Sequence, residues 1–176
     1  MWVILGNGGA KWGASPSDNL VLPLGVGKSR KMFLGHHVYT LDSKGRLTIP
    51  SRFREELTGS VVVTRSLDRC LTIYPMEIWE EIAQKVNALP ITSPQGRALR
   101  RIFFADAVDV EPDRQGRILV PERLREYAGL STSSETVVVG LDRFMELWAP
   151  ETWEAQNHRQ AEMMEENPAL WENLEI

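Results

Sequence analysis

The sequence predicts a mainly β protein with short helices, an α+β fold in which two similar modules follow one another. The main observation is a motif that occurs twice, as D-S-K-G-R-L-T-I-P-S-R-F-R-E in residues 42–55 and as D-R-Q-G-R-I-L-V-P-E-R-L-R-E in residues 113–126. Seven of the fourteen positions are identical, and three more exchange one apolar residue for another. Short alternating runs bounded by Gly, Pro and Asp surround both copies, as is typical of β-strands joined by turns. Two copies are too few for a solenoid and favour an intramolecular pseudo-dimer.

The same order of elements is expected in both modules. A strand, an Asp-to-Gly turn and a second strand come first, and a proline then starts a short helix, since proline at the first helical position loses no needed hydrogen bond. A hairpin and a longer helix complete the module. The expected strands are 37–41, 46–49, 61–64, 70–74, 107–110, 117–120, 136–140 and 144–148. The expected helices are 50–57, one from Pro75, 94–104, 121–128 followed by Gly129, and one from Pro150.

Apolar stripes at helical spacing predict the buried side of two of these helices. Their members are Trp79, Ile82, Ala83 and Val86 in the helix after Pro75, and Leu99, Ile102 and Phe103 in 94–104. Trp79, Trp148 and Trp153 are interpreted as core or interface packing. The expected organisation is a first module over 32–90, a linking helix and second module over 91–153, and an acidic helix or tail over 154–176. Residues 1–31, with six glycines and no periodicity, are expected to be a disordered leader or an over-extended start before Met32.

The charge is unevenly distributed along the chain. Residues 146–176 contain eight acidic residues and one arginine, a net charge of −7, whereas the whole chain carries −4 and the remainder therefore +3. A local basic face is enough to attract phosphates. The overall charge thus neither supports nor excludes a nucleic-acid partner.

No pattern for catalysis or metal binding is found. Cys70 is the one cysteine, which excludes an intramolecular disulfide and favours a reducing cytoplasm. Its place inside an expected strand argues against a nucleophile. His36 and His37 are neighbours on a strand and face opposite ways, and the next histidine is His158, so no metal site is expected. Phosphate-binding, nucleophile-elbow and dinucleotide motifs are not found either, and neither a cofactor nor a small-molecule substrate is expected.

Arg46 and Arg117 are the main candidate binding residues, because each follows its turn on the polar side of a short strand, four residues after Asp42 or Asp113. Two interpretations stay open and are compatible. The arginine forms a pair with the aspartate that fixes the turn or a module interface, or it contacts phosphate or a guanine edge, for which its planar fork is suited.

Other basic residues are weaker candidates. Lys44 and Arg114 lie at the turn tips, beside Gly45 and Gly116, and are either DNA contacts or ordinary solvated charge. For the arginines of the short helices, one of each pair is expected to face solvent and the other to pair with a neighbouring glutamate. These are Arg52, Arg54, Arg123 and Arg125, with Glu55, Glu56, Glu122 and Glu126 as partners. Arg97, Arg100 and Arg101 cluster on the linking helix and would contact either phosphate or another subunit.

The chain resembles the MraZ family over residues from Met32 to the mid-150s. The resemblance rests on F-L-G-x-x-x-x-T-L-D-S-K-G-R-L-T-I-P-S-R-F-R, V-V-T-R-S-L-D-R-C-L-T-I-Y-P, D-R-Q-G-R-I-L-V-P and V-V-V-G-L-D-R-F-M-E-L-W. It implies two SpoVT-AbrB-like modules that form a swapped-hairpin β-barrel with short helices. It also implies DNA contact by Arg46 and Arg117, both of which stand in intact motifs.

The function that the resemblance implies is sequence-specific binding to double-stranded DNA. Members of the family assemble into homo-oligomeric rings, bind direct repeats in the promoter of their own division and cell-wall operon, usually repress it, and associate with the nucleoid in the cytoplasm. The alternatives are an antitoxin-like module that neutralises a partner protein through residues 155–176 and a purely structural ring. An enzyme is the least favoured alternative, and no membrane association is expected.

Overall fold

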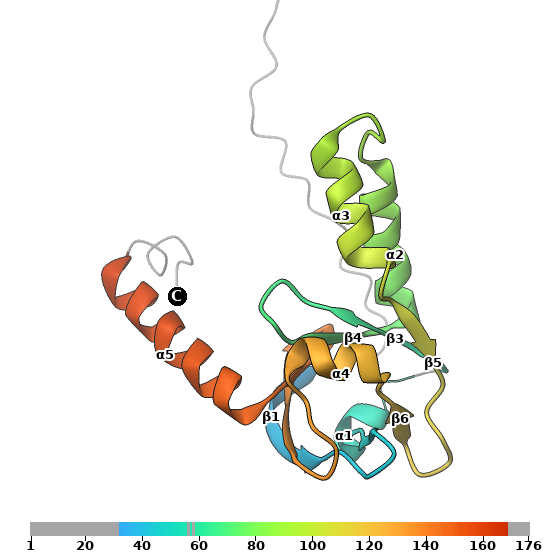
Figure 1. The fold of residues 1–176 in the computed structure, drawn as a ribbon, viewed down its shortest axis with the longest axis vertical. Coiled ribbons are helices and arrows are strands. Elements are labelled where there is room, and N and C mark those ends of the chain that lie inside the picture. Colours follow the sequence, from blue (N-terminus) through green and yellow to red (C-terminus); the bar gives the residue numbers. More distant parts are fainter. Residues whose placement is uncertain (1–31, 56, 58, 169–176) are drawn as a thin grey trace, which may run out of the picture. The chain divides into compact units, whose positions relative to one another are not determined.

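The computed structural model describes residues 32–55, 57 and 59–168, so the expected leader over residues 1–31 lies outside the described part. The described residues form eight strands and five helices, and Figure 1 shows how they are arranged. The first half comprises β1 (Phe33–Thr40), β2 (Arg46–Thr48), α1 (Ser51–Arg54), β3 (Val61–Arg65), β4 (Leu71–Pro75) and α2 (Met76–Ala88). The linking helix is α3 (Pro94–Phe104). The second half comprises β5 (Val108–Val110), β6 (Arg117–Leu119), α4 (Glu122–Ala128), β7 (Glu135–Asp142), β8 (Phe144–Trp148) and α5 (Pro150–Glu166).

The two halves exchange strands in one antiparallel sheet with the order β1-β7-β8-β4-β3-β5. The first strand of each half pairs with the third strand of the other half, as β1 with β7 and β5 with β3. The fourth strands, β4 and β8, pair with each other at the centre. The order is the same from either edge once the halves are interchanged, so the sheet has the pseudo-twofold symmetry of the sequence repeat.

A second, two-stranded sheet joins β2 to β6 and is called the β2–β6 ribbon below. Its antiparallel register places Leu47 opposite Ile118, and both side chains are buried. Two reciprocal main-chain hydrogen bonds extend the pairing at the ends. The amide of Ile49 donates to the carbonyl of Gly116, and the amide of Val120 donates to the carbonyl of Gly45, both at 2.9 Å. The ribbon thus holds one half against the other through equivalent bonds.

Apolar side chains from both halves form a common core. Phe53 of α1 and Leu124 of α4 hold equivalent positions in the repeated motif, and both are buried in this core. Burial of a large apolar side chain contributes about 1.5–3 kcal/mol. Each short helix therefore adds a large apolar side chain to the core that also contains Leu47 and Ile118 of the ribbon.

The expected mainly β fold with short helices is confirmed. The closed barrel is not confirmed, because β1 and β5 are the edges of an open six-stranded sheet within the described residues. None of the helices described is long and apolar enough to cross a membrane.

Three expectations about the elements need correction. Strand β1 begins at Phe33 rather than at 37, because β7 pairs with it from Phe33 to Thr40. The first short helix stops at Arg54 rather than at 57. Pro50, Pro75 and Pro121 precede the first helical residue instead of occupying it, whereas Pro150 does begin α5.

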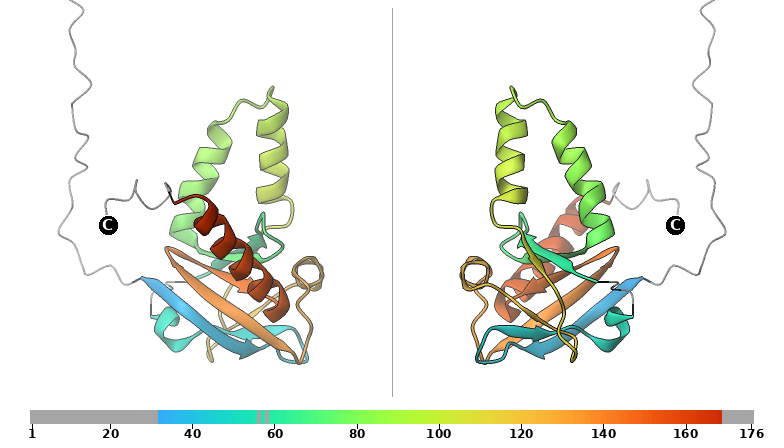
Figure 2. Two further views of the ribbon diagram at one scale, coloured as in Figure 1. Left: turned by 90° about the vertical axis from the view of Figure 1, so that its left-hand side faces the viewer. Right: turned by 90° about the vertical axis from the view of Figure 1, so that its right-hand side faces the viewer.

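Helix α3 is not buried along the expected stripe. Leu99, Ile102 and Phe103 are only half-buried, and Gly96 is its one fully buried residue. The reason is visible in Figure 2, where α2 and α3 form a hairpin that stands away from the sheet. The base of the hairpin is attached by Thr64, whose hydroxyl donates to the carbonyl of Phe103 at 3.2 Å.

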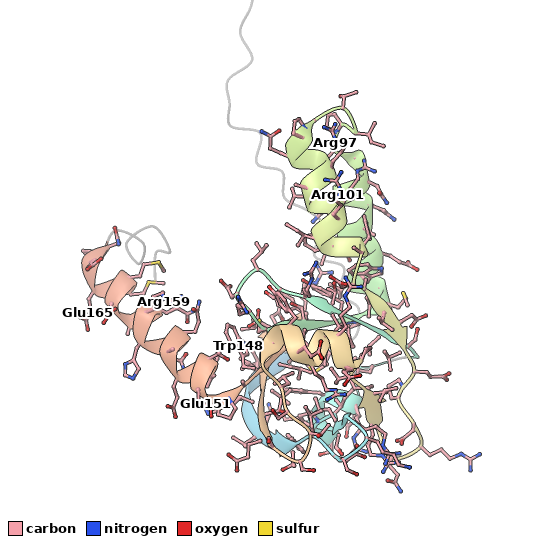
Figure 3. All side chains as sticks on the ribbon, in the orientation of Figure 1. Arg97, Arg101, Trp148, Glu151, Arg159 and Glu165 are labelled. Atoms are coloured by element: carbon pink, nitrogen blue, oxygen red, sulfur yellow. The ribbon has the colours of Figure 1, made fainter. Side chains whose placement is uncertain are left out.

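Two of the clustered arginines hold the tip of this hairpin together. Arg97 donates to the carbonyls of Ile91 and Thr92 at 2.9 and 2.8 Å. Arg100 donates to the carbonyls of Asn87 and Leu89 at 2.9 and 2.7 Å, which satisfies acceptors that the end of α2 leaves open. Arg101 is exposed further along α3 (Figure 3). These internal bonds give Arg97 and Arg100 a structural role within the chain.

A buried carboxylate joins the linking segment to both halves. The side chain of Asp106 is 1% exposed and forms ion pairs with Arg65 of β3, at 2.5 Å, and with Arg123 of α4. Arg123 is 75% exposed, as expected for one arginine of this helix, but its ionic partner is Asp106 and not a neighbouring glutamate. Arg65 also stacks over the ring of Tyr127, 5.1 Å from its centroid. A buried carboxylate needs such partners, since desolvation without them is costly.

Close packing of β7 on β1 gives a stability prediction for Gly140. A Cβ at this position would lie 2.5 Å from the carbonyl carbon of Phe33. Gly140→Ala should therefore lower the free energy of unfolding by about 2 kcal/mol in urea denaturation, because the backbone has to shift. Gly129→Ala is the control, since a Cβ there meets nothing within 4 Å and the cost is only that of φ +67°, about 1 kcal/mol. A Gly140→Ala protein as stable as the wild type would contradict this packing.

Candidate nucleic-acid interface

The first turn of the repeated motif is held by a single carboxylate. Asp42 Oδ1 accepts hydrogen bonds from the main-chain amides of Lys44 and Arg46, each at 2.9 Å. Asp42 Oδ2 accepts from Arg46 Nε at 2.6 Å. Aspartate favours such turns because its short side chain reaches amides two residues on. The same carboxylate thus closes the turn and orients the guanidinium.

The second turn repeats this geometry almost atom for atom. Asp113 Oδ1 accepts from the amides of Gln115 and Arg117 at 2.9 and 3.0 Å. Asp113 Oδ2 accepts from Arg117 Nε at 2.8 Å and lies 2.6 Å from Arg117 Nη2. The Asp–Arg pair predicted from spacing is therefore present in both copies.

These contacts lower the pKa of both carboxyl groups. Main-chain and side-chain hydrogen bonds from Arg46 hold the pKa of Asp42 below its ordinary value. For Asp113, the side-chain hydrogen bond from Arg117 is the largest cause, followed by the main-chain bond from the same residue, and the pKa falls to about 2. Both aspartates are therefore ionised at neutral pH, and each arginine has a permanent anionic anchor.

The glycine of each turn is covered by an arginine of the other half. Gly45 and Gly116 have φ of +76° and +72°, which a glycine adopts readily. A Cβ on Gly116 would lie 2.0 Å from Arg54 Cδ, and a Cβ on Gly45 would lie 2.8 Å from Arg125 Nε. Arg54 donates to the carbonyl of Gln115 at 3.1 Å, which ties α1 to the second turn. The positive φ therefore favours glycine at both turns, and any side chain there would also displace the arginine that covers it.

Arg125 is held by a carbonyl and not by the expected neighbouring glutamate. Its Nε donates to the carbonyl of Val120 at 3.0 Å. The sequence predicted that one arginine of each short helix faces solvent and the other pairs with a glutamate, and it did not indicate that Arg54 and Arg125 lie beside the turns. Arg54 and Arg125 hold matching positions in the two copies of the motif, but the turn glycine that each contacts lies 62 or more residues away. No local sequence signal could therefore reveal these contacts.

The outer face of the β2–β6 ribbon is the candidate binding surface. Strand alternation turns Leu47 and Ile118 to the core, so that the outer face carries Arg46, Thr48, Arg117 and Leu119. Arg46 lies opposite Leu119, and Thr48 lies opposite Arg117. The arginine side chains remain 32% and 27% exposed beside their aspartates, so fixing the turn leaves each guanidinium accessible.

The turn tips add two exposed basic side chains, Lys44 and Arg114, one at each end of the ribbon. The four predicted basic residues therefore lie on or beside one ribbon built from both halves. The tips are not equivalent, because Lys44 follows its aspartate by two positions and Arg114 by one. Thr48 and Leu119 of the same face were not predicted as site residues, although strand alternation would have placed them there.

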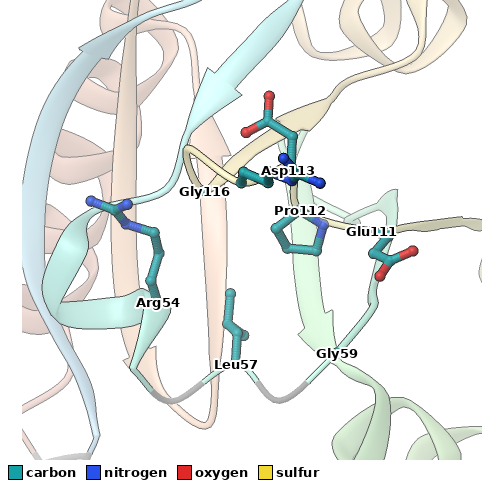
Figure 4. Close-up of a pocket in the computed structure, with 8 residues that line it drawn as sticks. Arg54, Leu57, Gly59, Glu111, Pro112, Asp113 and Gly116 are labelled. Atoms are coloured by element: carbon teal, nitrogen blue, oxygen red, sulfur yellow. The ribbon is translucent and has the colours of Figure 1, made fainter.

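A pocket of about 360 Å³ lies beside the second turn. Figure 4 shows Arg54 and Leu57 of the first half across from Asp113 and Gly116 of the second. Acidic and basic side chains both line it. Such a mixed lining does not define a charge class of ligand, so the exposed ribbon remains the better candidate.

The other reactive side chains have structural roles. Burial raises the pKa of the Cys70 thiol to about 12, with a smaller contribution from Glu146. A thiol in this state is a poor nucleophile at neutral pH. His36 packs against Trp153 and His37 against Phe53.

The predicted packing role of the tryptophans is confirmed. Trp148 is buried and lies 5.7 Å from Trp153, and Trp79 packs on Phe104, also with ring centroids 5.7 Å apart.

Comparison with known proteins identifies the family of the chain. A family model described as "MraZ protein, putative antitoxin-like" matches residues 32–102 and again residues 103–170. The Transcriptional regulator MraZ of Thermomicrobium roseum is 51% identical over 144 residues, which cover 81% of this chain and 97% of the relative. Those of Roseiflexus castenholzii (50%; 70% of this chain and 85% of the relative) and Herpetosiphon aurantiacus (46%; 81% and 96%) are similar.

The anchored turn predicts a pH dependence that can be measured at Asp113. Because its pKa in the folded state, about 2, is below the ordinary 3.8, its ionised form contributes stability above pH 3.8 that is lost as the pH falls toward 2. NMR titration of the carboxyl carbon should give a midpoint near 2, and Arg117→Met should move it toward 3.8. A midpoint that stays unchanged in Arg117→Met would show that the arginine does not hold the carboxylate.

Proposed function

Since this chain belongs to the MraZ family, we propose that it is a transcription regulator that binds double-stranded DNA through the outer face of the β2–β6 ribbon. It represses its own division and cell-wall operon by binding direct repeats in the promoter. It does so as a homo-oligomeric ring associated with the nucleoid. The two sequence modules act as one binding unit, an intramolecular pseudo-dimer. We assign no catalytic step to it.

The observation that carries this proposal is the pair of aspartate-anchored arginines on one exposed face. Arg46 and Arg117 come from different halves, and each is fixed by its own carboxylate at 2.6 to 2.8 Å. A guanidinium fixed in this way loses less conformational entropy when it binds, which favours planar recognition of phosphate or a guanine edge. The major groove of B-form DNA admits a two-stranded β-ribbon.

Each basic side chain has a distinct task on the DNA. Lys44 and Arg114, exposed at the turn tips, contact backbone phosphates and set the register. Arg46 and Arg117 lie on the ribbon face itself and reach the base edges. The phosphate contacts supply most of the affinity and make it depend steeply on salt. A ring presents several ribbons to tandem repeats, and linked weak sites raise the effective concentration at each one.

The decisive experiment compares arginine variants on the DNA upstream of the chain's own gene. Arg46→Ala and Arg117→Ala should each weaken binding by about fivefold or more in a gel shift, because each removes a contact of about 1–3 kcal/mol. Lys44→Ala should weaken binding to all sequences alike and reduce the slope of log affinity against log salt by about 1. Footprinting of the wild type then locates the protected repeats.

Arg159→Ala is the matched control, since this exposed arginine lies on α5 and not on the ribbon. It should bind as the wild type does. Normal binding by both ribbon variants would overturn the site. Light scattering measures whether each variant keeps its oligomeric state. An Arg46→Ala protein that loses its oligomer or unfolds would show that the arginine only stabilises the turn.

An antitoxin-like function is the second candidate, because the family description names it. Helix α5 offers a surface for a partner protein, since none of its residues is fully buried and Met163 is 45% exposed. The two functions are separated by purifying the intact chain and a chain that ends before residue 154, and by comparing the proteins that co-purify with each. A partner retained only by the intact chain supports the antitoxin-like function, whereas promoter binding by both supports the regulator.

A further inference from the structure

We propose that Leu119 contributes to sequence specificity by contacting the 5-methyl group of a thymine in the major groove. This inference rests on the proposed function and adds a residue that the arginine motif does not contain. Its starting point is an apolar side chain on a polar face. Leu119 is 52% exposed, whereas its neighbours Ile118 and Val120 are fully buried.

The position of Leu119 distinguishes it from an ordinary exposed leucine. It lies directly opposite Arg46 in the register of the ribbon, on the same outer face as Arg117. Side chains directly opposite in an antiparallel pair have Cβ atoms about 4.5–5.5 Å apart. Leu119 is therefore within reach of DNA that Arg46 contacts.

The two halves differ at this place. The position in the first half that corresponds to Leu119 is Thr48, which lies opposite Arg117. The outer face thus presents Arg46 with leucine and Arg117 with threonine. A ribbon with exact twofold symmetry would present the same residues beside both arginines. This ribbon instead presents a larger apolar side chain beside Arg46 than beside Arg117.

Thymine is the base that fits an apolar side chain flanked by cations. The charges of Arg46 and Arg117 favour a polyanion as the occupant of this face, rather than an apolar peptide. Within the major groove, the thymine methyl is the apolar group that marks a base pair. The structure therefore assigns Leu119 to a thymine beside the base pair that Arg46 contacts.

The test replaces single thymines by deoxyuridine, which removes the methyl group and keeps the base pair. Promoter duplexes with one replacement each are titrated with the full chain at fixed salt, with fluorescence anisotropy as the readout. Loss of one buried methyl group should weaken wild-type binding about fourfold at one position of each site. Leu119→Ser should bind the unmodified duplex at least about fourfold more weakly than the wild type. It should lose no further affinity for the duplex whose deoxyuridine weakens the wild type.

Leu67→Ser is the matched control, because Leu67 is 72% exposed but lies on the β3–β4 turn and not on the ribbon. It should retain the full deoxyuridine effect. Equal affinity of the wild type for all duplexes would overturn the inference about Leu119. A Leu119→Ser protein that keeps the deoxyuridine effect would overturn it too. Neither result would contradict the proposed function. Changed light scattering with unaltered DNA binding would make Leu119 a contact between copies of the chain. Failure of the wild type to bind any duplex overturns the proposed function as well.

Discussion

The reciprocal pairing of β2 with β6 is the interaction on which the rest of the structure depends. The amide of Ile49 reaches the carbonyl of Gly116, and the amide of Val120 reaches that of Gly45. These bonds bring both Asp-to-Gly turns to one ribbon, seat Leu47 on Ile118 in the core, and leave both arginines outside. Without them, each half would present one isolated turn above an incomplete core.

The Asp–Arg pairs show that stabilising a turn and presenting a cation are compatible. One carboxylate oxygen accepts two main-chain amides, which closes the turn, while the other accepts the guanidinium Nε. Arg46 contacts its aspartate through Nε and Arg117 through Nε and Nη2, yet the two side chains remain 32% and 27% exposed. The turn-fixing pair is therefore present, and it leaves the second interpretation, contact with DNA, open to test.

Local chemistry made much of the fold predictable, and long-range packing made the rest unpredictable. The turns at Asp42 and Asp113, the buried alternation around Leu47 and the place of the short helices follow from residues close together in sequence. The extension of β1 to Phe33 could not be predicted, because its partner lies about a hundred residues away. The same holds for the cover that Arg54 gives Gly116, and for Asp106, whose partners come from β3 and α4. In each case the residue type permitted the contact, and only the path of the chain decided it.

Strand exchange also has a consequence for the newly made chain. When the first half leaves the ribosome, β1 and β2 have no β7 or β6 to pair with, and β3 lacks one of its two neighbours. Their main-chain amides and carbonyls stay open until the partner strands β5, β6 and β7 have been synthesised, the last of which ends at Asp142. Such pairing between distant segments is slow, and unpaired edges join readily to other chains. The edges that the first half leaves open therefore stay exposed for the time that synthesis of the second motif and the strand after it takes.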